Sequence, residues 1–314
     1  MSLTTTLEHG TARLSPVVEG ERVIGFTLDR REGDGWRTYA RVQPLSRLVY
    51  RDKTGIRHAV ELAATAVHAQ PDGLVLTGDY GDADGVTWRL TVRIAQAAEP
   101  DQFAVHYTLA ADAAAQVLDW RGPALHVGTD IGGNPRDEAL FPGLEYLLDD
   151  EPSSDTRFAA AKYANRTIPH PYRITIPLMA VAGQGRAVGL MWDPNQDWHS
   201  AWRHPAALFA APDTLSGRGG LAYMALAAPA VEPRWRNEGE LEAHQPCGIG
   251  PNSPFTLSAR LVALGEGGVM GVVGAWLAAY GLPALPDVAC GEDYRANVDL
   301  CVRSYLDVAW DEDS

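Results

Sequence analysis

Alternation of apolar and polar residues is the feature of this sequence that most constrains its fold. In the segment 86–94 (VTWRLTVRI), Trp, Leu, Val and Ile occupy every second position from Trp88 onward, and Thr or Arg fills the positions between them. Successive side chains of a strand point to opposite faces of a sheet, so this pattern predicts a strand with one buried face. Related patterns occupy residues 21–28, 73–77 and 103–109.

The segments between these runs are typical turn material. REGDG, GDYGDADG and AAEPDQ combine Gly, Asp and Pro, which favour tight turns and interrupt strands. No convincing helical repeat occurs between residues 15 and 125, so an alternation of strands with crossover helices is not expected. The sequence therefore predicts a mainly β protein built as a large antiparallel β-sandwich.

Two amphipathic helices are predicted to follow this sandwich. Apolar residues recur at helical spacing from Gly268 to Tyr280, and Gly-Leu-Pro ends that pattern. A second pattern of this kind runs from Glu292 to Trp310. We therefore expect a sandwich domain at residues 1–265 and a helical region at 266–314, and we expect the natural chain to continue past Ser314. The helices would pack on the sandwich, on a second copy or on a further helical domain.

Charge and cysteine content restrict the partners and cofactors that we expect. The 314 residues include 26 Lys and Arg against 40 Asp and Glu, a formal net charge of −14 that disfavours nucleic acids and anionic membranes. The N-terminus lacks the basic and apolar regions of a secretion signal, so a cytoplasmic protein is predicted. The three cysteines form no CxxC pair, and no HExxH occurs. No metal and no cofactor are predicted.

The segment from Trp120 to Trp198 is the richest in side chains suited to sugars. Aromatic rings pack on the C–H faces of sugars, while charged and amide groups bond to the hydroxyls. The candidate substrate-binding residues are Trp120, Arg121, Glu145, Tyr172, Trp192, Trp198 and Arg203. The alternative for each Trp is a place in the hydrophobic core.

Three residues in the same part of the chain are candidates for acid–base catalysis: Glu145, His170 and Asp193. A carboxylate whose pKa is shifted by burial can exchange protons with a substrate, but a Glu that fixes a loop is the alternative for Glu145. Glycoside hydrolysis needs two carboxylates roughly 5 to 10 Å apart, a separation that sequence does not give. GxSxG, GxGxxG and P-loop motifs do not occur.

Three phrases in this region carry a resemblance to a known family. WRGPALHVG, ALFPGLEYL and TIPLMAV with the later GLMWDP resemble the N-terminal sandwich of bacterial proteins with a six-hairpin glycosidase-like region. That sandwich belongs to the galactose-mutarotase-like, or β-supersandwich, class. The resemblance implies a carbohydrate-active, glycoside hydrolase-like protein in which a following α/α toroid performs most of the catalysis. Glu145 and Trp192 would then shape the cleft or pack the sandwich.

Two other functions remain open for a sandwich of this class. One is a stand-alone aldose 1-epimerase, which uses a His acid and a Glu base; His126 or His170 with Glu145 or Glu238 are the candidates. The NHxxFNL-type segment of such epimerases is missing from the chain. The other is a noncatalytic carbohydrate-binding module. All three functions share carbohydrate as the expected partner.

Overall fold

The computed structural model describes residues 3–128, 136–153, 168–199, 202–231, 245–282 and 294–306, without the side chains of 202, 203 and 294. In this part of the chain, ten strands form one antiparallel sheet in the order β1-β2-β3-β4-β11-β19-β18, with β20 and β5 paired to β11 and β6 paired to β5. Their bounds are β1 Leu7–His9, β2 Ala12–Glu19, β3 Arg22–Glu32, β4 Gly35–Val42, β5 Ser46–Arg51, β6 Arg57–Leu62, β11 Ala115–Val127, β18 Ala206–Ala210, β19 Ala222–Ala230 and β20 Cys247–Ile249.

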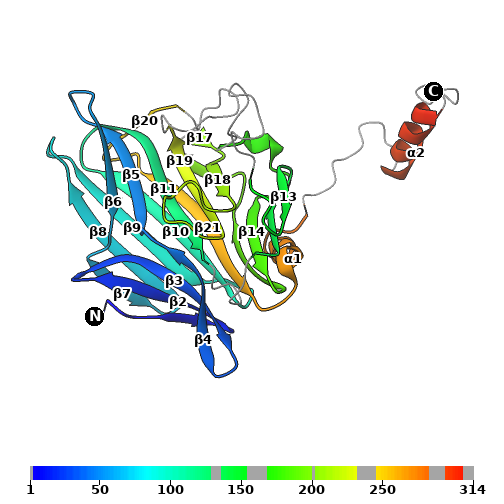
Figure 1. Cartoon of the computed structure of the whole chain (residues 1–314). Coiled ribbons are helices and arrows are strands. Elements are labelled where there is room, and N and C mark those ends of the chain that lie inside the picture. Colours follow the sequence, from blue (N-terminus) through cyan, green and yellow to red (C-terminus); the bar gives the residue numbers. More distant parts are fainter. Residues whose placement is uncertain are drawn as a thin grey trace. The chain divides into compact units, whose positions relative to one another are not determined.

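A second antiparallel sheet of nine described strands has the order β13-β12-β14-β15-β21-β10-β9-β8-β7 (Figure 1). Its strands are β7 Ala66–Gln70, β8 Gly73–Gly81, β9 Thr87–Gln96, β10 Gln102–Ala111, β12 Glu138–Phe141, β13 Glu145–Leu148, β14 Leu178–Gly183, β15 Arg186–Met191 and β21 Phe255–Leu264. A short pair, β16 (Asp197–His199) with β17 (Trp202–Arg203), and a 3-10 turn at Pro171–Arg173 complete the described β region. The predicted antiparallel β-sandwich is confirmed, and β3, β8, β9 and β10 match the four predicted runs to within one residue at their starts.

One hydrophobic core lies between the two sheets. It contains Phe26 and Leu48 from the ten-stranded sheet together with Trp88 and Phe103 from the nine-stranded sheet. Each of these side chains is nearly or fully buried, and burial of one large apolar side chain stabilises the fold by about 1.5–3 kcal/mol. The alternation read from residues 86–94 places the polar residues of β9 on the other face of its sheet.

The first predicted helix, α1, spans Gly268–Tyr280, as expected. Val269, Val272 and Trp276 pack on the outer face of the nine-stranded sheet, where they join a cluster with residues of β14, β15 and β21. Gly281, which follows the helix, has a φ of 72°, the left-handed conformation that commonly ends a helix. The first predicted helix therefore belongs to the sandwich.

The chain divides into two compact units after Tyr280, fifteen residues beyond the boundary expected at residue 265. The second unit, Gly281–Ser314, contains α2 at Tyr294–Ser304, within the range predicted for the second helix. No helix among the described residues is long and apolar enough to cross a membrane.

Candidate functional site

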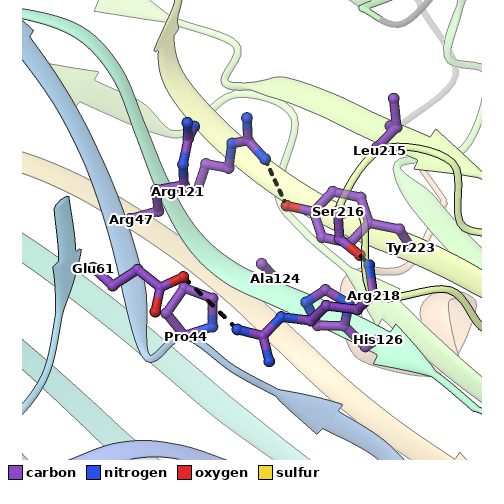
Figure 2. A pocket seen from close by; sticks show the side chains of 10 residues that line it. All are labelled: Pro44, Arg47, Glu61, Arg121, Ala124, His126, Leu215, Ser216, Arg218 and Tyr223. Carbon is purple, nitrogen blue, oxygen red and sulfur yellow. Dashed lines mark hydrogen bonds and ion pairs between the residues drawn. The ribbon is translucent and has the colours of Figure 1, made fainter. Parts of the chain in front are cut away.

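Two adjoining cavities lie over the outer face of the ten-stranded sheet, the face directed away from the core. The smaller, of about 90 Å³, is lined by side chains from β5, β6, β11 and β19 and from the loop after Pro212 (Figure 2). The larger, of about 410 Å³, is lined by residues of β4, by the end of β11 and by the same loop. His126 and Arg218 line both cavities, so the two spaces meet at these side chains.

One row of side chains crosses three neighbouring strands at this junction. His126 on β11 lies opposite Arg41 on β4 and opposite Tyr223 on β19. Cross-strand partners project from the same face of a sheet, and the neighbours of His126 in β11, Leu125 and Val127, are directed into the core. The alternation of β11 thus places His126 on the outer face, between an arginine and a tyrosine.

A second row carries the ionic groups of the smaller cavity. Arg121 of β11 pairs in register with Arg47 of β5, and Arg47 pairs with Glu61 of β6. The carboxylate of Asp119, which is 0% exposed, accepts hydrogen bonds from Arg47 Nη1 (2.9 Å) and Arg121 Nε (3.0 Å). Burial alone would lower the pKa of Arg121, but the nearby Tyr223 and Asp119 outweigh it and raise that pKa, so the guanidinium is charged.

Tyr223 connects the two rows. Its phenolic oxygen accepts a hydrogen bond of 3.0 Å from Nη1 of Arg121 (Figure 2). Its ring contacts the imidazole of His126, with ring centroids 5.0 Å apart and an angle of 54° between the ring planes. A phenol that accepts from a guanidinium still has its own O–H to donate. Tyr223 therefore brings a proton donor beside His126.

The imidazole of His126 is oriented by a buried carboxylate. Nδ1 of His126 donates to Oδ2 of Asp213 at 3.3 Å, and the side chain of Asp213 is 0% exposed. Burial acts to raise the pKa of Asp213, but hydrogen bonds from His126 and Ser216 outweigh it and lower that pKa. Nε2 of His126 is buried and has no hydrogen-bond partner among the described residues. With the proton on Nδ1, the neutral imidazole keeps its lone pair on Nε2.

Asp213 also holds the loop that carries Arg218. Its Oδ1 accepts from the backbone N–H groups of Leu215 (3.1 Å) and Ser216 (2.9 Å), and the hydroxyl of Ser216 bonds to Oδ2. Ser216 Oγ in turn accepts from the backbone N–H of Arg218 at 3.0 Å. Asp213 thus fixes a ring nitrogen of His126 and the position of Arg218 together.

Among the residues proposed from the sequence, Arg121 lines the smaller cavity, and His126, named as an epimerase acid, lies at its junction with the larger one. Tyr172 and Trp192 come together at a separate cavity of about 230 Å³, lined mostly by prolines and aromatic residues. Tyr172 is largely exposed there, whereas Trp192 is 2% exposed and belongs to the core.

Two of the proposed sugar-binding tryptophans, Trp120 and Trp198, are core residues. Both are 0% exposed and pack around Phe255. The indole N–H of Trp120 donates to Oγ of Ser46 at 2.9 Å, which satisfies its polar atom inside the protein. Neither ring has a face open to a sugar. Alternation along β11 directs Trp120 inward because Arg121 points outward.

The three candidates for acid–base catalysis lie on three different segments of the described chain. Glu145 begins β13, the edge strand of the nine-stranded sheet. His170 accepts a hydrogen bond from the backbone N–H of Tyr172 at the 3-10 turn, and Asp193 accepts one from Asn195 in a loop. The side chain of Arg203 and the whole of Glu238 lie outside the described residues.

Sequence reasoning missed Tyr223, Asp213, Arg41 and Arg218 as site residues. Arg41 stands at an exposed position of β4, but alternation does not show which outward faces meet a cavity. Tyr223 had no such signal, because the other residues of β19 are small or apolar. In the searched, described residues, no group of His, Cys, Asp and Glu has an arrangement that could hold a metal ion.

No protein-family model and no curated protein sequence matches the chain. Solved structures do match it. A galactose mutarotase related enzyme from Lactobacillus acidophilus has a TM-score of 0.46 at 10% identity, over 83% of this chain and 97% of its own. A GalM/aldose epimerase homologue from C. elegans has a TM-score of 0.45 at 8% identity, over 83% and 98%. A galactose mutarotase-like protein from Lactobacillus casei has a TM-score of 0.41 at 11% identity, over 83% and 99%. At these identities the likeness concerns the fold alone.

Proposed function

We propose that the chain binds an aldose at the junction of the two cavities and interconverts its anomers, the reaction of an aldose 1-epimerase. One observation carries the proposal: the side chain of His126 lines both cavities, its Nδ1 is fixed on Asp213, and its Nε2 has no hydrogen-bond partner among the described residues. An imidazole oriented in this way by a carboxylate is suited to general acid–base catalysis.

The reaction requires one group that takes a proton and one that gives a proton. Nε2 of His126 removes the proton of the anomeric hydroxyl, the C1–O1 bond becomes a carbonyl, and the bond from C1 to the ring oxygen breaks. The ring oxygen takes the proton of Tyr223 as it leaves. Rotation about the C1–C2 bond presents the other face of the aldehyde, and reversal of the two proton transfers closes the ring.

The surrounding groups support these roles. Asp213 stabilises the imidazolium that forms when His126 takes the proton, because its carboxylate accepts from Nδ1. Arg121 stabilises the charge that develops on the phenolic oxygen of Tyr223, because its guanidinium donates to that oxygen. The ring contact between His126 and Tyr223, with centroids 5.0 Å apart, supports a joint action of the two side chains on one sugar.

Optical rotation tests the proposal directly. The purified chain is added to freshly dissolved α-glucose, α-galactose and their 6-phosphates, and the approach to anomeric equilibrium is followed against buffer alone. We expect acceleration with at least one of these sugars, and a loss of about 10²–10⁴-fold in His126→Gln, the usual contribution of a general acid–base group. Tyr223→Phe is expected to lose activity while it keeps the ring contact with His126.

His68→Gln is the matched control, since His68 is an exposed histidine on β7 of the other sheet. Its activity is expected to equal that of the unchanged chain. Failure to accelerate any aldose, neutral or phosphorylated, contradicts the proposal. Sugar binding without acceleration would instead favour a noncatalytic carbohydrate-binding module.

A second candidate function is the support domain of a larger glycoside hydrolase-like protein, as the sequence resemblance implies. The observation that favours it is α2, an amphipathic helix that belongs to a unit separate from the sandwich. The coding sequence downstream of Ser314 tests this candidate. A long helical continuation supports it, and a stop codon directly after Ser314 contradicts it.

A further inference from the structure

The larger cavity differs in charge from the protein as a whole. The chain carries a formal net charge of −14, yet the described lining of this cavity contains Arg41, Arg218 and His126 and neither Asp nor Glu. Two arginines in one cavity of an acidic protein raise the local electrostatic potential where a ligand would enter. The cavity volume of about 410 Å³ lies in the range of small-molecule sites.

Arg41 is available to a ligand. It lies opposite His126 in the pairing of β4 with β11, and it has no ion-pair or hydrogen-bond partner among the described residues. Two other arginines of the sheet are engaged: Arg13 pairs with Asp29 at 3.0 Å, and Arg30 pairs with Asp101 at 2.9 Å. Arg41 is therefore exposed at the cavity without a counter-charge among the described residues.

Arg218 reaches the cavity from a fixed loop. The bonds from Asp213 and Ser216 hold the backbone on its N-terminal side. On its C-terminal side, Gly220 has a φ of 130°, and a Cβ at that position would lie 2.7 Å from the carbonyl oxygen of Val127, so the close approach of loop and strand requires glycine. The ion-pair partner of Arg218 is Glu61, at 3.7 Å and with both side chains substantially exposed. Such pairs contribute little and exchange readily for a bound anion.

We infer that the substrate is an aldose that carries an anionic group, a phosphate or a carboxylate, held between Arg41 and Arg218 in the larger cavity. This inference rests on the proposed function for the position of the sugar ring. His126 lies where the two cavities meet, so an anion bound on the arginine side directs the rest of the molecule toward His126 and Tyr223. The planar guanidinium groups of arginine suit phosphate and carboxylate oxygens, with which they form paired, charge-assisted hydrogen bonds.

Calorimetric titration with glucose 6-phosphate, glucuronate and glucose tests the inference. We expect the phosphate or the carboxylate sugar to bind at least about 10-fold more tightly than glucose, because hydrogen bonds between charged groups are stronger than those between neutral groups. The preference between the two anionic sugars identifies the group. Higher salt concentration is expected to weaken the binding of the anionic sugar and to leave glucose unaffected.

Arg41→Gln and Arg218→Gln are each expected to weaken binding of the anionic sugar by about 10-fold and to leave the affinity for glucose unchanged. Arg41→Lys keeps the positive charge but loses the planar fork, so its effect is expected to be smaller. The matched control is Arg22→Gln, an exposed arginine on β3 that lines neither cavity, with an expected change below 2-fold, or about 0.4 kcal/mol. Unchanged circular dichroism of the variants shows that the fold is retained.

Equal affinity for glucose and for both anionic sugars overturns the inference, as does an anionic preference that neither arginine variant reduces. If neutral aldoses are interconverted as fast as anionic ones, the proposed epimerase function stands and the anionic substrate class is rejected. If an anionic sugar binds through Arg41 and Arg218 but is not interconverted, the anion site stands and the epimerase function is rejected.

Discussion

The outer faces of the two large sheets are covered in opposite ways. On the nine-stranded sheet, Val269, Val272 and Trp276 of α1 pack on small and aliphatic residues of β14, β15 and β21. On the ten-stranded sheet, arginine, histidine and tyrosine occupy outward positions of β4, β5, β11 and β19 and surround two cavities, beside a smaller apolar cluster of β18 and β19 with Ile168. Both faces are produced by the same strand alternation, so what separates the packing face from the candidate site is the chemistry of the outward residues.

The ion pairs beside the cavities of the ten-stranded sheet require a carboxylate to be taken out of water, which costs free energy. Asp119 is fully buried under two guanidinium groups, and buried ion pairs of this kind often contribute no more to stability than apolar residues of the same volume. Charged groups in environments that perturb their pKa, as in such buried networks, are frequent at functional sites. The contrast between the two faces therefore supports the assignment of the site to the ten-stranded sheet.

Removing the buried charge of Asp119 in the ten-stranded sheet is expected to give the largest change in stability. Asp119→Ala leaves Arg121, which is 3% exposed, without its carboxylate, and breaking a buried ion pair by one partner typically costs about 3–5 kcal/mol in the free energy of unfolding. Urea unfolding measures the change. The control, Asp79→Ala, removes an exposed pair between Asp79 of β8 and Arg89 of β9 and is expected to leave the unfolding midpoint nearly unchanged. Equal effects of the two variants would contradict the difference between the faces.

Loss of the main apolar contact of α1 is expected to give the second-largest change in stability. Trp276 is 9% exposed, and Trp276→Ala is expected to lower the free energy of unfolding by about 3 kcal/mol through lost burial and the cavity left behind. The same helix offers a control, Met270→Ala, because Met270 is 66% exposed. If the faces are independent, Trp276→Ala does not alter sugar affinity at 20 °C, below its unfolding transition. A change in affinity would show that the two faces are coupled.

The sequence predicted the packing of the sandwich better than its site, and β11 shows why. The alternation in WRGPALHVG indicates that Trp120 and Arg121 point to opposite faces, but not which of these faces is the core. Sugar binding was assigned to both residues, and the structure places Trp120 in the core and Arg121 at the cavity. Asp213 and His126 are 87 residues apart, and only the pairing of β11 with β19 brings them together. Local patterns carry no information about such a contact.

A change in the packing of α1 on β15 is expected to have a smaller effect on stability. A Cβ added at Gly189 would lie 2.3 Å from Cγ1 of Val272 and 2.9 Å from Cγ1 of Val262. Gly189→Ala is therefore expected to cost about 1–3 kcal/mol by overpacking. The matched variant in the helix, Gly274→Ala, meets no atom within 4 Å and is expected to stabilise the protein by about 0.5–1 kcal/mol through higher helix propensity. Thermal unfolding distinguishes the two signs, and stabilisation by Gly189→Ala would contradict the tight contact between helix and sheet.

The smallest expected effect concerns a histidine on the outer face of the nine-stranded sheet. Burial, assisted by the charge of Arg93, lowers the pKa of His106 below its ordinary value of 6.5, and Nδ1 lies 2.7 Å from Oγ of Ser258. Because the folded state favours the neutral ring, its contribution to stability is complete above pH 6.5. As the pH falls below that value, the unfolded chain takes up the proton first, and the contribution is lost as the pH passes through the folded pKa.

His106→Gln keeps a polar side chain beside Ser258 and removes the titration. Urea unfolding at several pH values between 7.5 and 5 is expected to show a shallower loss of stability in this variant than in the unchanged chain, with the difference confined to the range below pH 6.5. Parallel profiles would show that the ring of His106 is as accessible to a proton in the folded state as in the unfolded chain. A shallower profile would identify His106 as a pH-sensitive group of the packing face that is independent of His126, because the two imidazoles lie on different sheets.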